Sequence, residues 1–136
     1  TGSHLLRVAS ITKTFTSMLM FMLRDAGLVA ADDDVRRYIT AFDIQSTLRT
    51  QNKTTLRQLA SHTSGLPRDL EYPCGFNPNC SAHQVYTQLA ESYLVVAPGT
   101  RFHYSNVGFA LLGRALEAAW NASRTPRHQY EDLVEE

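Results

Sequence analysis

One segment, from about Ser10 to Gly27, places the strongest constraint on how this chain can fold. Met20 and Phe21 add apolar bulk outside its main stripe, so the second half is apolar on nearly every side. A helix of this kind is buried on several sides, and we expect large elements to pack around it. The main stripe follows the three- and four-residue spacing of one α-helical face, at Ile11, Phe15, Met18, Leu19, Met22 and Leu23.

Capping residues and apolar repeats predict further helices along the chain. The longest reaches about Trp120 and carries few polar residues, so we expect it to be largely buried. We find no convincing set of strands, and the prediction is a mostly α chain. The predicted helices begin at side chains that favour N-caps or first turns, near Asp32 to Asp34 (a short helix through Tyr38), Thr54 or Thr55, Ser81, Ser105 or Asn106, and Pro126.

Size and charge exclude several classes of protein. A chain of 136 residues suits one compact domain and is too short for two. Thirteen basic residues balance thirteen acidic ones without a basic run, so we expect no nucleic-acid partner. The longest apolar run, Met18 to Leu23, is far shorter than the roughly 20 residues of a transmembrane helix. Because the sequence opens without Met, we expect a processed product or a piece of a longer chain.

Lysine is used sparingly, which draws attention to Lys13. Of the thirteen basic residues eleven are Arg, and the only lysines are Lys13 and Lys53. Ser10 and Lys13 are three residues apart and so share one face of a helix start, where developing negative charge is favoured. An amine made neutral by burial would accept the Ser10 proton. Taken alone, the pair is more often an N-cap serine followed by a solvated lysine.

A second group of chemically capable residues is Tyr104-Ser105-Asn106. A phenol beside a lysine ammonium has a lowered pKa and can carry a proton. An asparagine amide both donates and accepts, so Asn106 could hold a substrate amide and steady the lysine. Taken alone, these residues are also typical of an aromatic before a helix and an asparagine near its cap.

Three segments together resemble a known family. They are Ser10-Ile-Thr-Lys13, Leu-Ala-Ser-His-Thr-Ser-Gly-Leu-Pro at 59–67, and Pro-Gly-Thr-x-Phe-x-Tyr-Ser-Asn-x-Gly-Phe-Ala-Leu-Leu-Gly at 98–113. In order and spacing they are similar to the serine β-lactamase-related family, from about Leu6 to the end of the chain. That family holds class C β-lactamases, D-alanyl-D-alanine carboxypeptidases and β-lactamase-like esterases and peptidases.

The resemblance implies a role for each matching residue. Ser10 would be the acylated nucleophile, with its backbone N–H as one oxyanion donor, and Lys13 the amine that activates it. Tyr104 would act as general base and acid with Lys13, and Asn106 would bind the substrate amide. No cofactor and no metal is implied, and the partner would be a small-molecule or peptide acyl substrate.

The resemblance also implies a fold that this chain only partly supplies. The family fold is an antiparallel sheet flanked by helices, with a helical lobe. Residues 1–136 match a single partial domain, the nucleophile helix at about 10–27 plus the helical lobe of this α/β β-lactamase/transpeptidase-like fold, with the sheet largely missing. No Lys-Thr-Gly or His-x-Gly strand follows Asn106. We therefore expect this piece alone to lack hydrolase activity.

Two functional hypotheses follow. The first is a serine hydrolase that forms an acyl-enzyme with an amide, peptide, ester or β-lactam. The second is a catalytically inactive fragment or pseudoenzyme that acts as an interaction or scaffold module. Apolar helices without their cover would also offer a surface for self-association.

Other polar residues allow weaker predictions. Cys74 and Cys80 lie in a Pro- and Asn-rich loop and could form a local disulfide, while with His83 they match no strong zinc pattern. For Ser64, in the His-Thr-Ser-Gly turn, we favour a structural role, and for the histidines solvated or capping roles. Localisation stays open, although three N-glycosylation sequons favour a secreted, periplasmic or lumenal protein; their asparagines are Asn52, Asn79 and Asn121.

Overall fold

The computed structural model describes residues 7–48, 53–71, 73–75, 79–122, 124 and 127–135. Within these residues the chain is mostly helical, as predicted, and the only β-type pairings are two isolated bridges, Asp34 with Thr55 and Gln45 with Tyr93. The elements are two 3-10 turns and five α-helices: η1 (Ala9–Ile11), α1 (Thr12–Asp25), η2 (Val35–Arg37), α2 (Leu56–Ala60), α3 (Ala82–Glu91), α4 (Asn106–Asn121) and α5 (Tyr130–Glu135).

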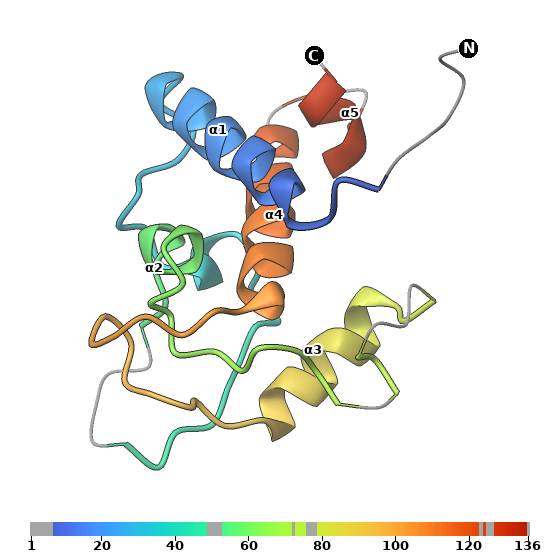
Figure 1. The fold of residues 1–136 in the computed structure, drawn as a ribbon. Coiled ribbons are helices and arrows are strands. Elements are labelled where there is room, and N and C mark those ends of the chain that lie inside the picture. The colour runs from blue at the N-terminus through green and yellow to red at the C-terminus, as the bar shows by residue number, and fades with distance from the viewer. Residues whose placement is uncertain are drawn as a thin grey trace.

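Helix α4 is the central element of the fold (Figure 1). It contacts α1, α2, α5 and η2. Ser105 is its N-cap, with the side chain accepting a hydrogen bond from the Gly108 N–H at 2.8 Å. The helix is apolar on most sides, so several elements can pack around it at once. The prediction of a long, largely buried helix capped at Ser105 or Asn106 is confirmed, and the structure selects Ser105.

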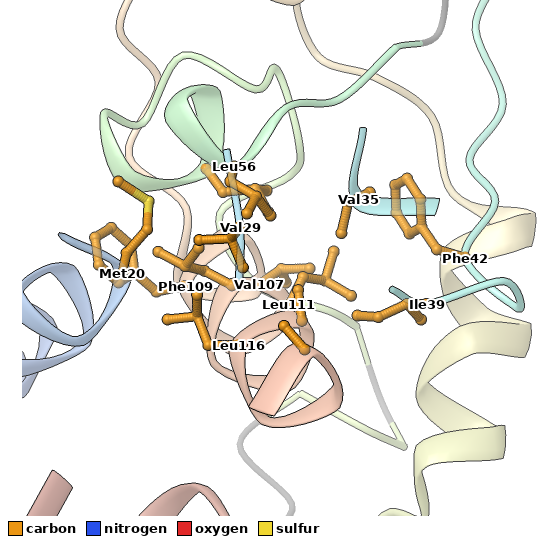
Figure 2. Close-up of a cluster of buried hydrophobic side chains, with 14 of the residues drawn as sticks. Met20, Val29, Val35, Ile39, Phe42, Leu56, Val107, Phe109, Leu111 and Leu116 are labelled. Atoms are coloured by element: carbon orange, nitrogen blue, oxygen red, sulfur yellow. The ribbon is translucent and has the colours of Figure 1, made fainter. Parts of the chain in front are cut away.

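The hydrophobic core gathers around α4 (Figure 2). Leu112, Ala115 and Leu116 are fully buried in it. Burying one leucine side chain favours folding by about 1.5–3 kcal/mol, so these contacts fix α4 firmly. The other elements contribute side chains that include Met20, Val29, Val35, Ile39, Phe42 and Leu56.

Helix α1 buries a different face from the one its periodicity predicts. Its buried residues are Thr16, Leu19, Met20 and Leu23. The prediction of the buried stripe is therefore wrong for most of its members, because a helix that is apolar all round does not specify which side meets the core. Between 47% and 61% of the surface stays exposed at Ile11, Phe15, Met18, Phe21 and Met22.

Side-chain caps set the start of α2 and α3 as the sequence indicates. Thr55 forms a capping box with Gln58 at α2, and Ser81 forms one with Gln84 at α3. The acidic run behaves differently from the prediction. Asp34 caps only the single 3-10 turn η2, and no α-helix extends through Tyr38.

The loop between α2 and α3 contains a disulfide between Cys74 and Cys80. These thiols are bonded to each other and so are not available to bind zinc in this structure. Within the described residues, no group of three His, Cys, Asp or Glu side chains converges as a metal site. Nor does any described helix combine the length and hydropathy of a membrane span.

The sequon asparagines differ in their surroundings. Asn52 lies outside the described residues, and Asn79 is exposed. The side-chain amide of Asn121 donates to the His128 carbonyl at 2.7 Å and accepts from the His128 N–H at 2.9 Å. This engagement counts against Asn121 as a glycan acceptor.

Two glycines provide a matched test of the turn that follows α2. Gly65 (φ +75°) has no room for a side chain, since an added Cβ would lie 2.1 Å from the Val96 carbonyl oxygen, whereas Gly27 (φ +72°) faces open space. We expect Gly27→Ala to lower the free energy of unfolding by about 1–2 kcal/mol, the cost of left-handed backbone. Gly65→Ala should lower it by about 2–5 kcal/mol because steric overlap is added. Urea denaturation measures both, and equal losses would contradict the prediction.

Candidate active site

The start of α1 places Ser10 and Lys13 together. Ser10 lies in the 3-10 turn that leads into the helix, and Lys13 Nζ donates to Ser10 Oγ at 3.4 Å. Ser10 is exposed and Lys13 is partly buried. The residue before the serine, Ala9, has φ +48°, which is uncommon for a residue other than glycine. Local backbone geometry therefore presents the hydroxyl at the surface beside the amine.

Tyr104 reaches the same point from a segment 94 residues away. It precedes α4, and its phenol oxygen lies 2.8 Å from Ser10 Oγ in a hydrogen bond. Lys13 Nζ is 5.0 Å from the centre of the Tyr104 ring. The hydroxyl, the phenol and the amine that the sequence singles out are thus brought together.

Asn106, the first residue of α4, completes the group. Lys13 Nζ donates to Asn106 Oδ1 at 2.8 Å, and Asn106 Nδ2 donates to Asp69 Oδ1 at 2.7 Å. An ionised carboxylate has no hydrogen to donate, so Asp69 takes the NH₂ end of the Asn106 amide. The oxygen end of that amide therefore faces Lys13. All four predicted site residues therefore belong to one connected set of contacts.

The surroundings of Tyr104 favour its ionised form. Hydrogen bonding to the Lys13 ammonium lowers the pKa of the phenol most, followed by the hydrogen bond with Ser10. The positive charges of Lys13 and Arg68 lower it further, and the Arg68 guanidinium lies 5.0 Å from the ring centre. These contacts lower the cost of negative charge on the phenol oxygen.

Three residues of this neighbourhood escaped the sequence-based predictions. Of the solvated or capping roles expected for the histidines, the solvated role is wrong for His62, whose ring stacks on Tyr104 with centroids 4.3 Å apart. Its Nδ1 accepts a hydrogen bond from the N–H of the N-cap residue Ser105. Asp69 and Arg68 carried no signal, because their partners are distant in sequence. For His62 a signal existed, namely a histidine at the end of a helix where glycine is usual.

A cavity of about 540 Å³ opens beside the site. Lys13, Asn106 and Asp69 line its polar end, and the rest is largely apolar, with Leu70, Val85 and Leu111 among its walls. Ser10 and Tyr104 do not line it. Ser10 Oγ thus lies outside the cavity, whose lining begins at Lys13 and Asn106.

This arrangement can move a proton over short distances. The Ser10 hydroxyl is hydrogen-bonded to the Tyr104 phenol, whose pKa is lowered, and the Lys13 amine lies next to both groups. Such a set can convert an alcohol into a nucleophile and return the proton later.

Comparisons with known proteins identify the family of this chain. The family model described as Beta-lactamase matches residues 1–136. The chain is 41% identical to Beta-lactamase-like protein 2 of Dictyostelium discoideum over all of this chain and 24% of that protein. It is 36% identical to the D-alanyl-D-alanine-carboxypeptidase/endopeptidase AmpH of Escherichia coli (strain K12), over 96% of this chain and 33% of that protein.

A solved structure of a related protein has a similar fold. The β-lactamase/D-alanine carboxypeptidase from Yersinia pestis superposes with a TM-score of 0.73 and 32% identity, over 95% of this chain and 36% of that one. The chain thus spans about a quarter to a third of the length of the curated relatives named above. Because the family model matches the chain from end to end, the chain belongs to the beta-lactamase family.

Proposed function

We propose that this chain carries the nucleophile of a serine hydrolase that works through a Ser10 acyl-enzyme. The supporting observation is the 2.8 Å hydrogen bond between Ser10 Oγ and the Tyr104 phenol, next to Lys13. The substrate is an acyl compound, namely an amide, peptide, ester or β-lactam. The peptidase activity in the name of the Escherichia coli relative favours amide bonds among these.

In the first step Ser10 Oγ attacks the substrate carbonyl while its proton passes to the Tyr104 phenolate. The lowered pKa of Tyr104 supports this assignment, because it reduces the cost of forming the phenolate. Collapse of the tetrahedral intermediate breaks the bond to the leaving group, which takes the proton back from Tyr104. In the second step water attacks the Ser10 ester while one of its protons passes to Tyr104. Collapse of this second intermediate breaks the bond between Ser10 Oγ and the acyl carbon, and Ser10 Oγ takes the proton from Tyr104 as the acid product leaves.

Lys13 and Asn106 serve this chemistry without forming bonds to the substrate carbon. Lys13 stabilises the phenolate by its charge and orients Ser10 Oγ. Asn106 Oδ1 is held by Lys13, while Nδ2 uses one hydrogen for Asp69 and keeps the other for a substrate carbonyl. The Ser10 backbone N–H is the first oxyanion donor.

We further propose that residues 1–136 are a single partial domain, the nucleophile helix plus a helical lobe. The exposed apolar face of α1 supports this, since monomers seldom leave such a continuous patch uncovered. The missing sheet of the family fold would cover it and supply the second oxyanion donor. The alternative function, an inactive scaffold module, would use the same face for self-association or for another protein.

Covalent labelling tests the nucleophile. In the protein that contains this chain, a fluorophosphonate or β-lactam probe should add its mass to the peptide bearing Ser10, and Ser10→Ala should abolish the adduct. Lys13→Ala should slow labelling by at least about 10²-fold, the usual contribution of acid–base assistance. Lys53→Ala, at the only other lysine, should label normally. Absence of any adduct would favour the scaffold hypothesis.

Isolated residues 1–136 should be inactive. Loss of one oxyanion donor alone costs about 10²–10³ in rate, and the exposed face of α1 also loses its cover. A chromogenic acyl ester assayed with the isolated chain and its Ser10→Ala variant should give equal background rates. A Ser10-dependent rate from the isolated chain would show that it holds a complete site.

The charge of Lys13 should set the ionisation of Tyr104. Lys13→Met removes the largest cause of the lowered pKa, so the pKa of Tyr104 should rise toward its ordinary value of 10.0. The phenolate would then be lost at pH values where the unmodified protein retains it. Tyrosine ¹³Cζ NMR titration measures this, with Lys53→Met as the control. An unchanged Tyr104 titration in Lys13→Met would contradict the assigned cause.

A further inference from the structure

Helices α1 and α2 end in the same hydrogen-bonded motif but with different residues at its critical position. In α1 the Gly27 N–H donates to the Arg24 carbonyl and the next N–H reaches back to Leu23, both at 2.9 Å. In α2 the His62 N–H donates to the Leu59 carbonyl at 3.3 Å and the next N–H to Gln58 at 2.9 Å. Both are Schellman endings, in which the residue after the C-cap takes a left-handed conformation.

Glycine is the favoured residue at this position because it has no Cβ to clash. Gly27 meets this preference with φ +72°, whereas His62 adopts φ +57° with a full side chain. Together with Ala9, His62 is one of two described residues other than glycine with a positive φ, and both lie beside the site. A strained backbone persists where other contacts determine it, and such strain clusters at functional sites.

Most of the contacts that hold His62 reach the segment that carries Tyr104. Its Nδ1 accepts a hydrogen bond from the Ser105 N–H at 3.0 Å, and its carbonyl accepts one from the His103 N–H at 2.7 Å. Its ring stacks on Tyr104 at an interplanar angle of 28°. Phe109 of α4 lies against the same imidazole at 4.9 Å. Residues 103 to 105 are therefore each bound by His62.

The backbone at Ser105 has particular need of such a partner. Ser105 is the N-cap of α4, so its N–H precedes the helix and has no acceptor within it. The residue is 1% exposed, and a buried N–H without a partner is costly. The His62 nitrogen thus fixes the backbone directly after Tyr104, while the ring supports the face of the phenol.

We propose that His62 is a positioning residue that holds the Tyr104 phenol against Ser10, through ring stacking and through the hydrogen bond from the Ser105 N–H to its Nδ1. The proposal rests on the proposed function for its catalytic consequence. It does not place His62 in contact with the substrate.

The role requires a neutral imidazole, because a protonated Nδ1 cannot accept the Ser105 N–H. Burial lowers the pKa of His62 below its ordinary 6.5, and the charge of Lys13 lowers it further. Lys13 acts on the His62 ring through its charge, and Tyr104 stacks on the ring. Arg68 lies on the Tyr104 ring, and Phe102 and Phe109, the other rings against His62, bring no charge. The positioned form is therefore present at neutral pH and is lost as the pH falls through the lowered pKa.

Two substitutions separate the ring from the acceptor. His62→Gly relieves the left-handed backbone but removes both contacts, and we expect it to lower kcat about 10- to 100-fold with a smaller change in KM. His62→Asn tolerates the left-handed conformation and offers Oδ1 to the Ser105 N–H. His62→Asn should lose less activity than His62→Gly. Because it has no imidazole, its plot of kcat against pH should lack the ionisation of His62 on the acid side. His83→Asn on α3, outside the site, should match the unsubstituted protein.

Chemical rescue distinguishes positioning from a general loss of structure. Added imidazole should restore part of the kcat of His62→Gly at pH 7.5, since it can stack and accept. Pyrrole has a ring of the same size without an acceptor nitrogen, so it should restore less. Unchanged kcat in His62→Gly, equal rescue by both compounds, or an unaltered acid limb in His62→Asn would each overturn the proposal.

A readout independent of catalysis separates this inference from the proposed function. Amide hydrogen exchange at Ser105, followed by NMR with ¹⁵N-serine labelling of the protein that contains this chain, should accelerate in His62→Gly. It should remain slow in His62→Asn and slow again when imidazole is added. If the unsubstituted protein forms no Ser10 adduct, the proposed function fails whatever the exchange shows. If Ser105 exchange is the same in all variants, the role of His62 fails although the nucleophile stands.

Discussion

The hydrogen bond from Lys13 Nζ to Asn106 Oδ1, 2.8 Å long, joins the first turn of α1 to the first residue of α4. The other site contacts depend on this junction of two helix starts. Ser10 lies three residues before Lys13, and Tyr104 lies two residues before Asn106. The position of each is therefore set by the helix that starts directly after it. The core packing of α1 on α4 through Leu19, Met20 and Leu23 holds the two starts at this separation. A displacement of either helix would therefore separate Ser10 from Tyr104.

Stability is unevenly distributed around this junction. The core side of α4 is fully buried, whereas the outer face of α1 is apolar and exposed within the described residues. The two left-handed residues other than glycine, Ala9 and His62, adjoin Ser10 and Tyr104. The left-handed backbone at Ala9 and His62 is unfavourable by itself. The packing of the helices in the core stabilises the fold enough to retain it.

The sequence predicts the parts of the fold that depend on local chemistry. N-caps depend on side-chain hydrogen bonds within three residues, and the structure confirms the cap predicted at Ser81. It selects Thr55 over Thr54 and Ser105 over Asn106 at the other two predicted caps. The buried face of α1 could not be predicted, because an apolar surface on all sides leaves the choice to tertiary packing. The same holds for Asp69, whose partner Asn106 is 37 residues away. For the site, only the spacing of Ser10 and Lys13 is local, and the approach of Tyr104 was expected from the family resemblance alone.

The near-exclusive use of arginine elsewhere in the chain explains why a lysine at position 13 is informative. A guanidinium is planar and directs its donors in a fixed fork. An ammonium is compact and can donate to Ser10 Oγ and Asn106 Oδ1 while resting 5.0 Å from the Tyr104 ring. Arg68 supplies a second positive charge near that ring and forms an ion pair with Asp69 at 3.5 Å. The charge of Lys13, Arg68 and Asp69 together is positive, which favours both the phenolate and the oxyanion that would form on an attacked carbonyl.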